Sequence, residues 1–520
     1  MSALASARPA LGLIMGLLIG RGLNVTYDQL AKIAASFGLR DSMVHIWAYS
    51  LHIGHGYGLP MEYAHSRPGL PDQIRPYVFE FYLDLYVREI LQHAGPSKGA
   101  RRSLRNWTDL GTLHNAIRGY SEFKAKCDLD IWTTMHRIGH QQLPHFDRFG
   151  AAYFGRYWSL YKRGRLSNIV FKALGLTSED YFLVAGATQA LFMRNYEVAL
   201  MPQLAALGLD SSAVAARVAA ISGTPKLLRS RCALDARYDS SWDYTPNPIV
   251  VKPLIQLRSN ALDRLTCPRP SLLGKRLLAG LFYDLADADG FAQAYGDAFE
   301  ELVGDCFSHL TGQTTAERPA PYFVGKAHYH GSDWLLRDAS TSLFVECKTM
   351  RIPVPARLAA SPGDLESGLT RLAKAVVQNY RNILDATSGR AGIKLPDGPI
   401  YSLIVTLEDW ILFSHKSVDA LTSLVEKELE ARGMDPSLQE RHPFSIVSYA
   451  ALPELVDSIS EHGLRVLTEK STHRFKGYLF PQFLKDAGLS KEGSAASMFD
   501  REWEDLMGRL RSRFPTASLT

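Results

Sequence analysis

Long apolar and aromatic stretches with helical spacing dominate the first 240 residues. In Pro76–Leu91 no glycine or proline interrupts the stretch, and Asp147–Tyr161 contains only two glycines. Such stretches are typical of buried helices. The run Leu11–Ile19 is shorter than the roughly 20 residues that a bilayer-spanning helix needs. It also lacks a small-residue cleavage site, so we expect a buried N-terminal helix there and no signal peptide.

The pattern changes between Asp239 and Pro270, where prolines interrupt the chain repeatedly. Proline disfavours continuous helix, so we expect a connection between domains in this region. We therefore predict a helical domain over 1–245, with a sensing, nucleic-acid-binding or regulatory role. A proline-rich connection with a lead-in helix over 246–285 precedes an α/β domain over 286–465. A helical extension over 466–520 completes the chain.

Short apolar segments alternate with helical ones after residue 330. We expect strands at 331–337, 343–348, 401–407 and 444–448, and helices at 365–384, 418–432 and 453–462. This order predicts a mixed β-sheet flanked by helices. The predicted fold is an α/β C-terminal domain preceded by a large, mostly α-helical N-terminal domain.

The first two predicted strands form a hairpin that carries three charged side chains. Turn-like residues lie between them, and a turn centred between Ala339 and Ser340 pairs residues whose numbers sum to 679. This register places Asp333 opposite Glu346, with Cβ atoms about 5 Å apart. Because strand side chains alternate between faces, Lys348 shares the face of Glu346. Two carboxylates and an ammonium group are therefore expected on one patch.

Two carboxylates at this separation repel each other, and a divalent cation relieves the repulsion. Mg²⁺ typically takes one or two carboxylates together with waters and substrate phosphate oxygens. A bound metal lowers the pKa of a water molecule and stabilises charge at phosphorus. Lys348 would position or help deprotonate the attacking water, or would neutralise the transition state. The patch thus suits metal-assisted phosphodiester hydrolysis with Mg²⁺, for which Mn²⁺ is a substitute.

Asp333, twelve intervening residues and Glu346-Cys-Lys348 together resemble the PD-(D/E)XK, or restriction-endonuclease-like, nuclease superfamily. The resemblance covers roughly residues 290–465, and Ser332 stands where the family has proline. Gly296-Asp-Ala-Phe-Glu300 is similar to the helix that precedes the hairpin in the family.

The resemblance implies that Glu300 joins Asp333 and Glu346 as a metal ligand, with Glu301 as the alternative. Lys374-Ala-Val-Val-Gln378-Asn-Tyr380 is similar to a later family helix that carries a glutamine and a tyrosine. It implies a catalytic role for Gln378 beside Lys348. The implied activity is that of a Mg²⁺-dependent endonuclease, with DNA favoured over RNA as substrate.

Other motifs are weaker. Glu122-Phe-Lys124 repeats the E-x-K triplet, but in a helix-like stretch that lacks an opposing aspartate. His136 and His140 have the i, i+4 spacing of a zinc protease motif, but Arg137 stands where that motif needs glutamate. A helical zinc protein is therefore a third hypothesis.

The charge is distributed unevenly along the chain. Residues 1–285 carry 33 basic and 21 acidic side chains, whereas residues 286–520 carry 25 and 32. The excess of positive charge indicates that the N-terminal half contacts a polyanion. Cations interleaved with aromatic residues suit nucleic-acid phosphates and bases. We expect this contact at Arg156, Lys162, Arg163 and Arg165.

The composition excludes several classes of protein. With 46% hydrophobic and 21% charged residues, the chain is neither disordered nor collagen-like. Five scattered cysteines favour a reduced cytoplasmic environment, and no membrane contact is expected.

The leading hypothesis is a nuclease of restriction or antiviral defence, held in check by a regulatory protein or a phage-derived trigger. The alternative is a non-catalytic nucleic-acid-binding or protein-interaction scaffold on the same fold.

Overall fold

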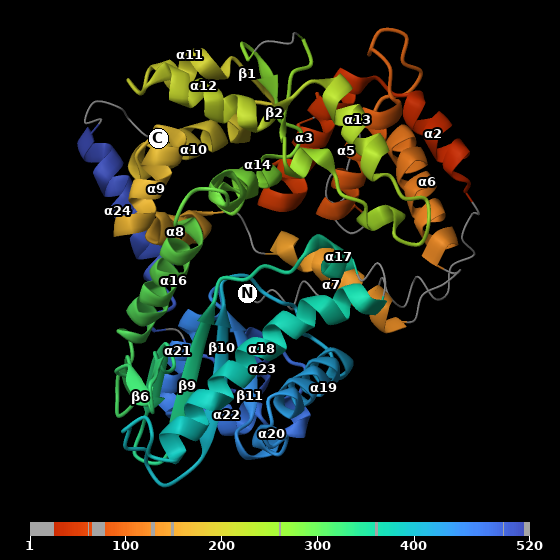
Figure 1. Cartoon of the computed structure of the whole chain (residues 1–520). Helices are drawn as coiled ribbons and strands as arrows, with labels where there is room; N and C mark the ends of the chain where they lie inside the picture. Colours follow the sequence, from red (N-terminus) through yellow and green to blue (C-terminus); the bar gives the residue numbers. More distant parts are fainter. Residues whose placement is uncertain are drawn as a thin grey trace. The chain divides into compact units, whose positions relative to one another are not determined.

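The computed structural model divides the chain into two compact units, which are described separately (Figure 1). Unit 1 comprises 1–158, 167–289 and 510–520, and unit 2 comprises 159–166 and 290–509. The structure describes residues 25–60, 62–64, 78–125, 131–146, 150–258, 262–358, 362–491 and 493–513. The predicted N-terminal helix over Leu11–Ile19 lies outside the described residues. Within these ranges, none of the helices is long and apolar enough to cross a membrane.

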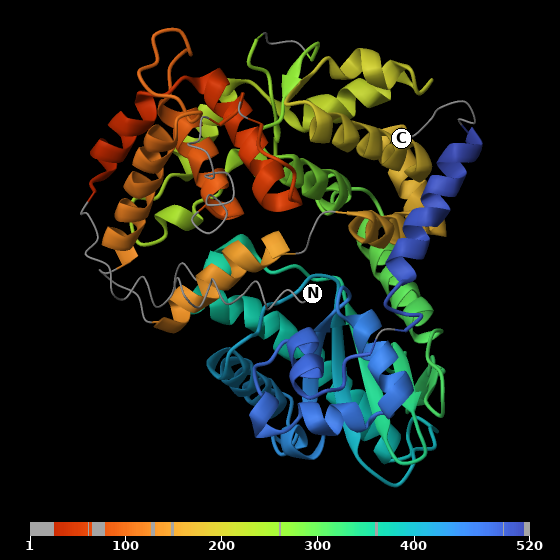
Figure 2. The same ribbon diagram turned by 180° about the vertical axis from the view of Figure 1, so that it is seen from behind.

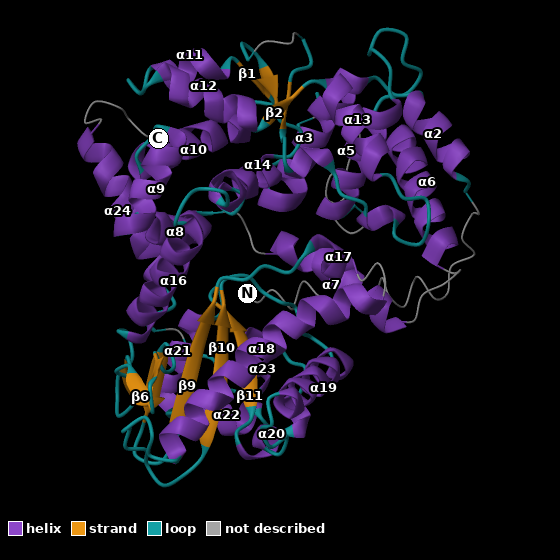
Figure 3. Cartoon of the chain, viewed as in Figure 1, coloured by secondary structure: helices purple, strands orange, loops and turns teal. Residues whose placement is uncertain are grey.

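Unit 1 is mainly helical, as the apolar spacing predicts (Figure 3). Its helices are α2 (Tyr27–Ala35), α3 (Leu39–His55), α5 (Glu80–His93), α6 (Trp107–Ala125), α7 (Ile131–Phe146), most of α8 (Ala151–Tyr161) and α9 (Gly164–Leu174), α10 (Ser178–Arg194), α11 (Leu200–Ala205), α12 (Ser211–Ala220), α13 (Pro225–Asp235), α14 (Pro270–Leu278) and α15 (Leu281–Leu285). Four two-residue strands form a small sheet in the order β1 (Glu197–Val198), β4 (Leu265–Thr266), β3 (Leu254–Ile255), β2 (Ser222–Gly223). The core of unit 1 lies mainly among α2, α3, α5 and α6.

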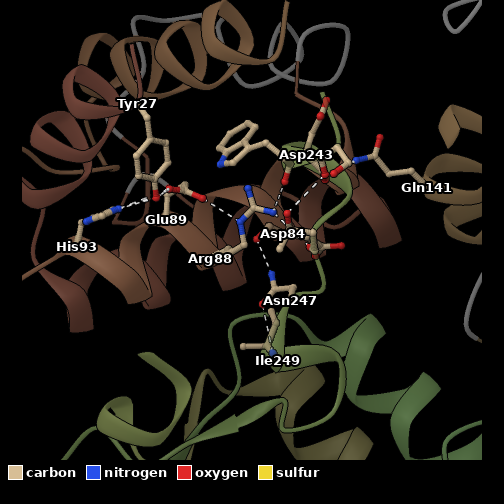
Figure 4. Close-up of polar contacts among 12 residues, drawn as sticks. Tyr27, Asp84, Arg88, Glu89, His93, Gln141, Asp243, Asn247 and Ile249 are labelled. Carbon is tan, nitrogen blue, oxygen red and sulfur yellow. Dashed lines mark hydrogen bonds and ion pairs between the residues drawn. The ribbon is translucent and has the colours of Figure 1, made fainter. Parts of the chain in front are cut away.

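The proline-rich segment predicted as a connection belongs to unit 1 and is pinned to α5. Arg88 donates to the backbone carbonyl of Trp242 at 2.8 Å, and its guanidinium lies 4.6 Å from the centre of the indole ring. Asn247 donates to the carbonyl of Asp84 at 2.7 Å, as Figure 4 shows. Ile249 is fully buried. The prolines interrupt the helical structure, but the segment is not a linker. Polar residues of the segment and of α5 hydrogen-bond to backbone carbonyls across the contact. After this segment, the chain passes from unit 1 to unit 2 between residues 289 and 290.

Unit 2 contains a five-stranded mixed sheet in the order β11-β10-β9-β8-β5. The strands are β5 (Thr315–Glu317), β8 (Trp334–Arg337), β9 (Ser342–Lys348), β10 (Ile400–Thr406) and β11 (Phe444–Ser448). The pairs β9–β10 and β10–β11 are parallel, whereas β8 pairs antiparallel with β9 and β5. A separate hairpin is formed by β6 (Tyr322–Val324) and β7 (Ala327–Tyr329). The predicted mixed sheet is confirmed.

Helices cover both faces of this sheet. On one face lie α18 (Pro362–Thr387) and α19 (His415–Ala431), whose apolar residues form a core with β9 and β10. On the other face lie α16 (Phe291–Phe307) and the helices that follow β11, as the reverse view of Figure 2 shows. The remaining helices are α17 (Val354–Leu358), α20 (Leu438–Arg441), α21 (Leu452–His462), α22 (Arg465–Lys470), α23 (Phe480–Asp486) and α24 (Met498–Arg513), the last entering unit 1 at Leu510.

Candidate functional site

The hairpin of β8 and β9 has the predicted register. Trp334 pairs with Val345 and Arg337 with Ser342, so the numbers sum to 679. Asp333 directly precedes β8, and its Oδ2 accepts a hydrogen bond of 2.6 Å from the backbone N–H of Cys347. The register therefore places the Asp333 carboxylate beside the position of Glu346 on β9.

Lys348 links two other predicted site residues, Glu346 and Gln378. Its Nζ lies 2.5 Å from Oε1 of Glu346 and donates to Oε1 of Gln378 at 3.2 Å. Gln378 comes from α18, which packs on the face of the sheet that carries both charged side chains. Tyr380, in contrast, is fully buried and donates to the carbonyl of His442 at 3.0 Å. Gln378 belongs to this cluster, and Tyr380 supports the fold.

The structure distinguishes Glu300 from its neighbour on α16. Glu300 interacts electrostatically with Asp333, and its carboxylate lies 3.7 Å from the guanidinium of Arg318. Its backbone carbonyl accepts a hydrogen bond of 3.1 Å from Nε1 of Trp334, which ties α16 to the hairpin. Glu301 is paired with Arg163 at 3.0 Å. Glu300 is thus the carboxylate of this helix that reaches the cluster.

Burial disfavours the charged forms of all three carboxylates, and the charge of Asp333 adds repulsion at Glu346 and Glu300. Glu346 is 1% exposed, and its burial, with the charge of Asp333 as the next cause, raises its pKa to about 8. Burial and then Asp333 raise the pKa of Glu300 to about 7. Burial also raises the pKa of Asp333. The cluster holds more acidic groups than its single lysine neutralises.

The lysine itself stays protonated. Burial alone would lower the pKa of Lys348, but the adjacent Glu346 carboxylate outweighs this effect and raises the pKa. An ammonium group in this position can stabilise negative charge, whereas a general base would have to be neutral. Of the roles that the sequence left open for Lys348, the electrostatic one agrees best with this geometry.

One carboxylate oxygen of the cluster lacks a hydrogen bond. Oε2 of Glu346 is buried, and no partner for it exists among the described residues. Across the same residues, no group of three or more His, Cys, Asp or Glu side chains is arranged to hold a metal ion. The predicted ligands Asp333, Glu346 and Glu300 are thus not arranged as a three-carboxylate metal site. Asp333 and Glu346 still offer two carboxylates, the number that Mg²⁺ commonly takes from a protein, and Glu346 has an oxygen to spare. These residues fit the predicted ion.

Asn379 supports the site and was not identified from the sequence. Its fully buried side-chain amide donates to the carbonyl of Phe344 and to Oγ of Ser402, both at 2.9 Å. Its Oδ1 accepts a hydrogen bond of 3.4 Å from Ser332, the residue before Asp333. Asn379 thus connects α18 to β9, to β10 and to the start of β8. A polar asparagine among the apolar positions of the predicted helix at 365–384 is the signal by which sequence analysis could have identified it.

The four predicted nucleic-acid contacts are divided between the two units. Arg156 belongs to unit 1, where its guanidinium lies 5.4 Å from the ring of Tyr153, and the other three belong to unit 2. Arg165 is exposed. Lys162 pairs with Glu502 at 2.5 Å and with Asp505 at 3.3 Å. Arg163 pairs with Glu301 and Asp305. Lys162 and Arg163 thus hold helices of their own unit together.

The weaker motifs lie in helices of unit 1. Glu122 and Lys124 are in α6, so this E-x-K triplet lacks the strand that the hairpin provides. His136 and His140 are neighbours on α7, with ring centroids 4.5 Å apart. The described residues supply no third metal ligand beside them.

Neither the family models nor the curated proteins nor the solved structures contain a match to this chain.

Proposed function

We propose that unit 2 is a metal-dependent nuclease with a restriction-endonuclease-like fold that hydrolyses phosphodiester bonds. One observation carries the proposal: Asp333, Glu346 and Lys348 converge at one end of a buried hairpin, with Gln378 against the lysine. An excess of buried carboxylates is unfavourable in the free protein, and a divalent cation relieves it. The resemblance of the same residues to the PD-(D/E)XK superfamily agrees with this chemistry.

Each residue has a role that follows from its position. Asp333 and Glu346 would hold the ion, and Glu300, which interacts electrostatically with Asp333, would add negative charge. Lys348 would stabilise negative charge that develops on the phosphate oxygens during attack by water. Gln378 accepts a hydrogen bond from Lys348 and so fixes the direction of its ammonium group.

Mg²⁺, or Mn²⁺ in its place, would lower the pKa of the attacking water and stabilise charge at phosphorus. The protein side chains then supply the orientation. Glu346 and Lys348 lie on one face of β9, with Asp333 beside Glu346, so water and phosphate would approach from that side.

Incubation of the purified protein with plasmid, linear duplex, single strands and tRNA, with and without Mg²⁺ or Mn²⁺, tests the proposal. Cleavage that requires the metal and disappears in Lys348→Ala supports it. Lys124→Ala removes the lysine of the helical E-x-K triplet and is the matched control, which should cleave normally. Metal-independent binding without cleavage by the parent protein would instead select the scaffold alternative.

The biological role that we propose is a restriction-type or antiviral defence effector, with DNA as the preferred substrate. The motivating feature is a large helical unit on the same chain as the candidate nuclease. An unrestrained nuclease would damage its host, so a regulatory protein or phage-derived trigger is expected. Toxicity on expression that Lys348→Ala abolishes would support this role, and equal toxicity of parent and variant would contradict it.

A further inference from the structure

A cleft of about 470 Å³ opens beside the candidate site, with Lys348 and Gln378 in its wall. The exposed stripe of α18 lines it with Arg371, Lys374 and Arg381, whose spacing with Gln378 places all four side chains on one face of the helix. None of the side chains lining the cleft is acidic. The cleft is therefore suited to an anionic ligand.

The cations of the cleft are only partly neutralised. Glu428 lies 4.0 Å from Lys374 and 3.4 Å from Arg432, a further cation of the lining. Arg371 is exposed, and no described residue forms an ion pair with it. Lys374 is also exposed, with 55% of its side-chain area accessible. These two positions remain available for phosphate groups.

The hairpin of β6 and β7 adds aromatic rings to the lining of the cleft. His328 and His330 line the cleft, with ring centroids 4.7 Å apart. Phe323 pairs with His328 across the hairpin, their centroids lie 4.8 Å apart, and Phe323 is 68% exposed. Phe323 is not part of the cleft lining, so His328 and His330 are the rings of this face that a ligand in the cleft can reach.

The other face of the hairpin holds it against α18. Tyr322 donates to Oδ2 of Asp385 at 2.6 Å. The guanidinium of Arg381 lies 4.2 Å from the centre of the Tyr329 ring and also donates to its hydroxyl. Because the tyrosines anchor the hairpin, the exposed rings keep a fixed distance from the cationic stripe. The arrangement resembles a site preorganised for a ligand with both phosphates and flat rings.

We infer that this cleft binds single-stranded nucleic acid, with phosphates on the α18 stripe and bases stacked on the hairpin rings. The inference rests on the proposed function, because it assigns the substrate strand of the same site. In a duplex the bases are stacked inside and cannot reach side-chain rings, whereas unpaired bases can. Phosphate contacts by cations add affinity without sequence preference.

Binding in EDTA separates this inference from catalysis. The full-length protein is titrated into a fluorescein-labelled oligonucleotide of 20 thymidines and into a labelled duplex of equal length, and anisotropy is recorded at several salt concentrations. We expect tighter binding of the single strand. The double variant His328→Ala with His330→Ala should weaken single-strand binding about tenfold and leave duplex binding unchanged.

The stripe is tested by the double variant Arg371→Ala with Lys374→Ala. Each lost phosphate contact should reduce the salt slope by about 0.7, so the double variant loses about 1.4. The control replaces Arg441 and Lys491, two cations of unit 2 that are about half exposed and lie outside the cleft lining. Circular dichroism and thermal melting establish that all variants fold.

The outcomes are distinct. An unchanged affinity and salt slope in the stripe variant, or equal binding of strand and duplex with no effect of the double histidine variant, would overturn the inference. If the parent binds the strand in EDTA but never cleaves nucleic acid with Mg²⁺, the proposed function fails and the cleft assignment stands.

Discussion

The carboxylate of Asp333 accepts a hydrogen bond from the backbone N–H of Cys347, with Oδ2 2.6 Å from the nitrogen. This bond fixes the side chain of a residue just before β8 to the backbone of β9, next to Glu346. The candidate site therefore depends on hairpin register as much as on residue identity.

Replacing Asp333 with asparagine separates the charge of this residue from its hydrogen bond. Asparagine can still accept from Cys347 through its side-chain oxygen, so the fold should survive. With the negative charge removed, the pKa of Glu346 should fall, because Asp333 contributes to raising it. Metal-dependent cleavage should fall at least about 100-fold, the order expected when an electrostatic contribution to the transition state is lost. Unchanged cleavage by Asp333→Asn would contradict the role of Asp333 as a metal ligand.

Asn379→Ala should destabilise unit 2. The substitution leaves the carbonyl of Phe344 and the hydroxyl of Ser402 without their buried donor. Such a loss costs about 1–3 kcal/mol in the free energy of unfolding, which urea titration measures. Gln378→Ala, at the neighbouring exposed position, should change stability by less than about 0.5 kcal/mol. Equal stability of the two variants would show that Asn379 does not connect α18 to the sheet.

Gly304→Ala should loosen the contact between α16 and the hairpin. A Cβ atom at this position would lie 2.2 Å from the Trp334 ring, so the ring or the helix must move. Overpacking of this kind costs about 1–3 kcal/mol, and it should also displace Glu300 from the cluster.

Gly296→Ala on the same helix is the control. No atom lies within 4 Å of a Cβ at Gly296, so alanine should stabilise α16 by about 0.5–1 kcal/mol. If both substitutions shifted the melting temperature in the same direction, the tight contact between Gly304 and Trp334 would be contradicted.

His114 should make the stability of unit 1 dependent on pH. Its Nδ1 lies 2.7 Å from the hydroxyl of Tyr86, and burial, with Arg118 as a smaller cause, lowers its pKa to about 4. Between pH 6.5 and 4 the unfolded chain binds a proton that the folded chain does not. The stability that depends on neutral His114 is therefore fully present above pH 6.5 and is lost as the pH falls towards 4.

His114→Asn removes this titration. The parent should lose about 1–3 kcal/mol more than the variant between pH 7 and pH 4, as measured by denaturant titration at each pH. Parallel pH profiles for the two proteins would exclude His114 as the responsible group.

Local patterns predicted β8, β9, β10 and β11, because their apolar runs and turn residues act over a few positions, but they missed β5 and the hairpin of β6 and β7. The hairpin register followed from one turn, and it correctly placed Asp333 beside Glu346. Partners far apart in the chain were harder to predict. Nothing near Lys162 or Arg163 in the sequence indicates that acidic residues more than 100 positions away pair with them.

The proline-rich segment illustrates the same limit. Its prolines correctly indicate irregular backbone, but only the tertiary contact with Arg88 on α5 shows that the segment belongs to unit 1. Asn379 also needed the structure, since its partners Ser332, Phe344 and Ser402 lie on three other segments.

The most direct test of the nuclease assignment is the cleavage of single-stranded and duplex DNA by Glu346→Gln in the presence of Mg²⁺. Glutamine keeps the shape of the buried side chain and removes the charge that would bind the ion. The account predicts that the parent cleaves with Mg²⁺, and that Glu346→Gln folds normally and does not cleave. Cleavage by Glu346→Gln at the rate of the parent would contradict it.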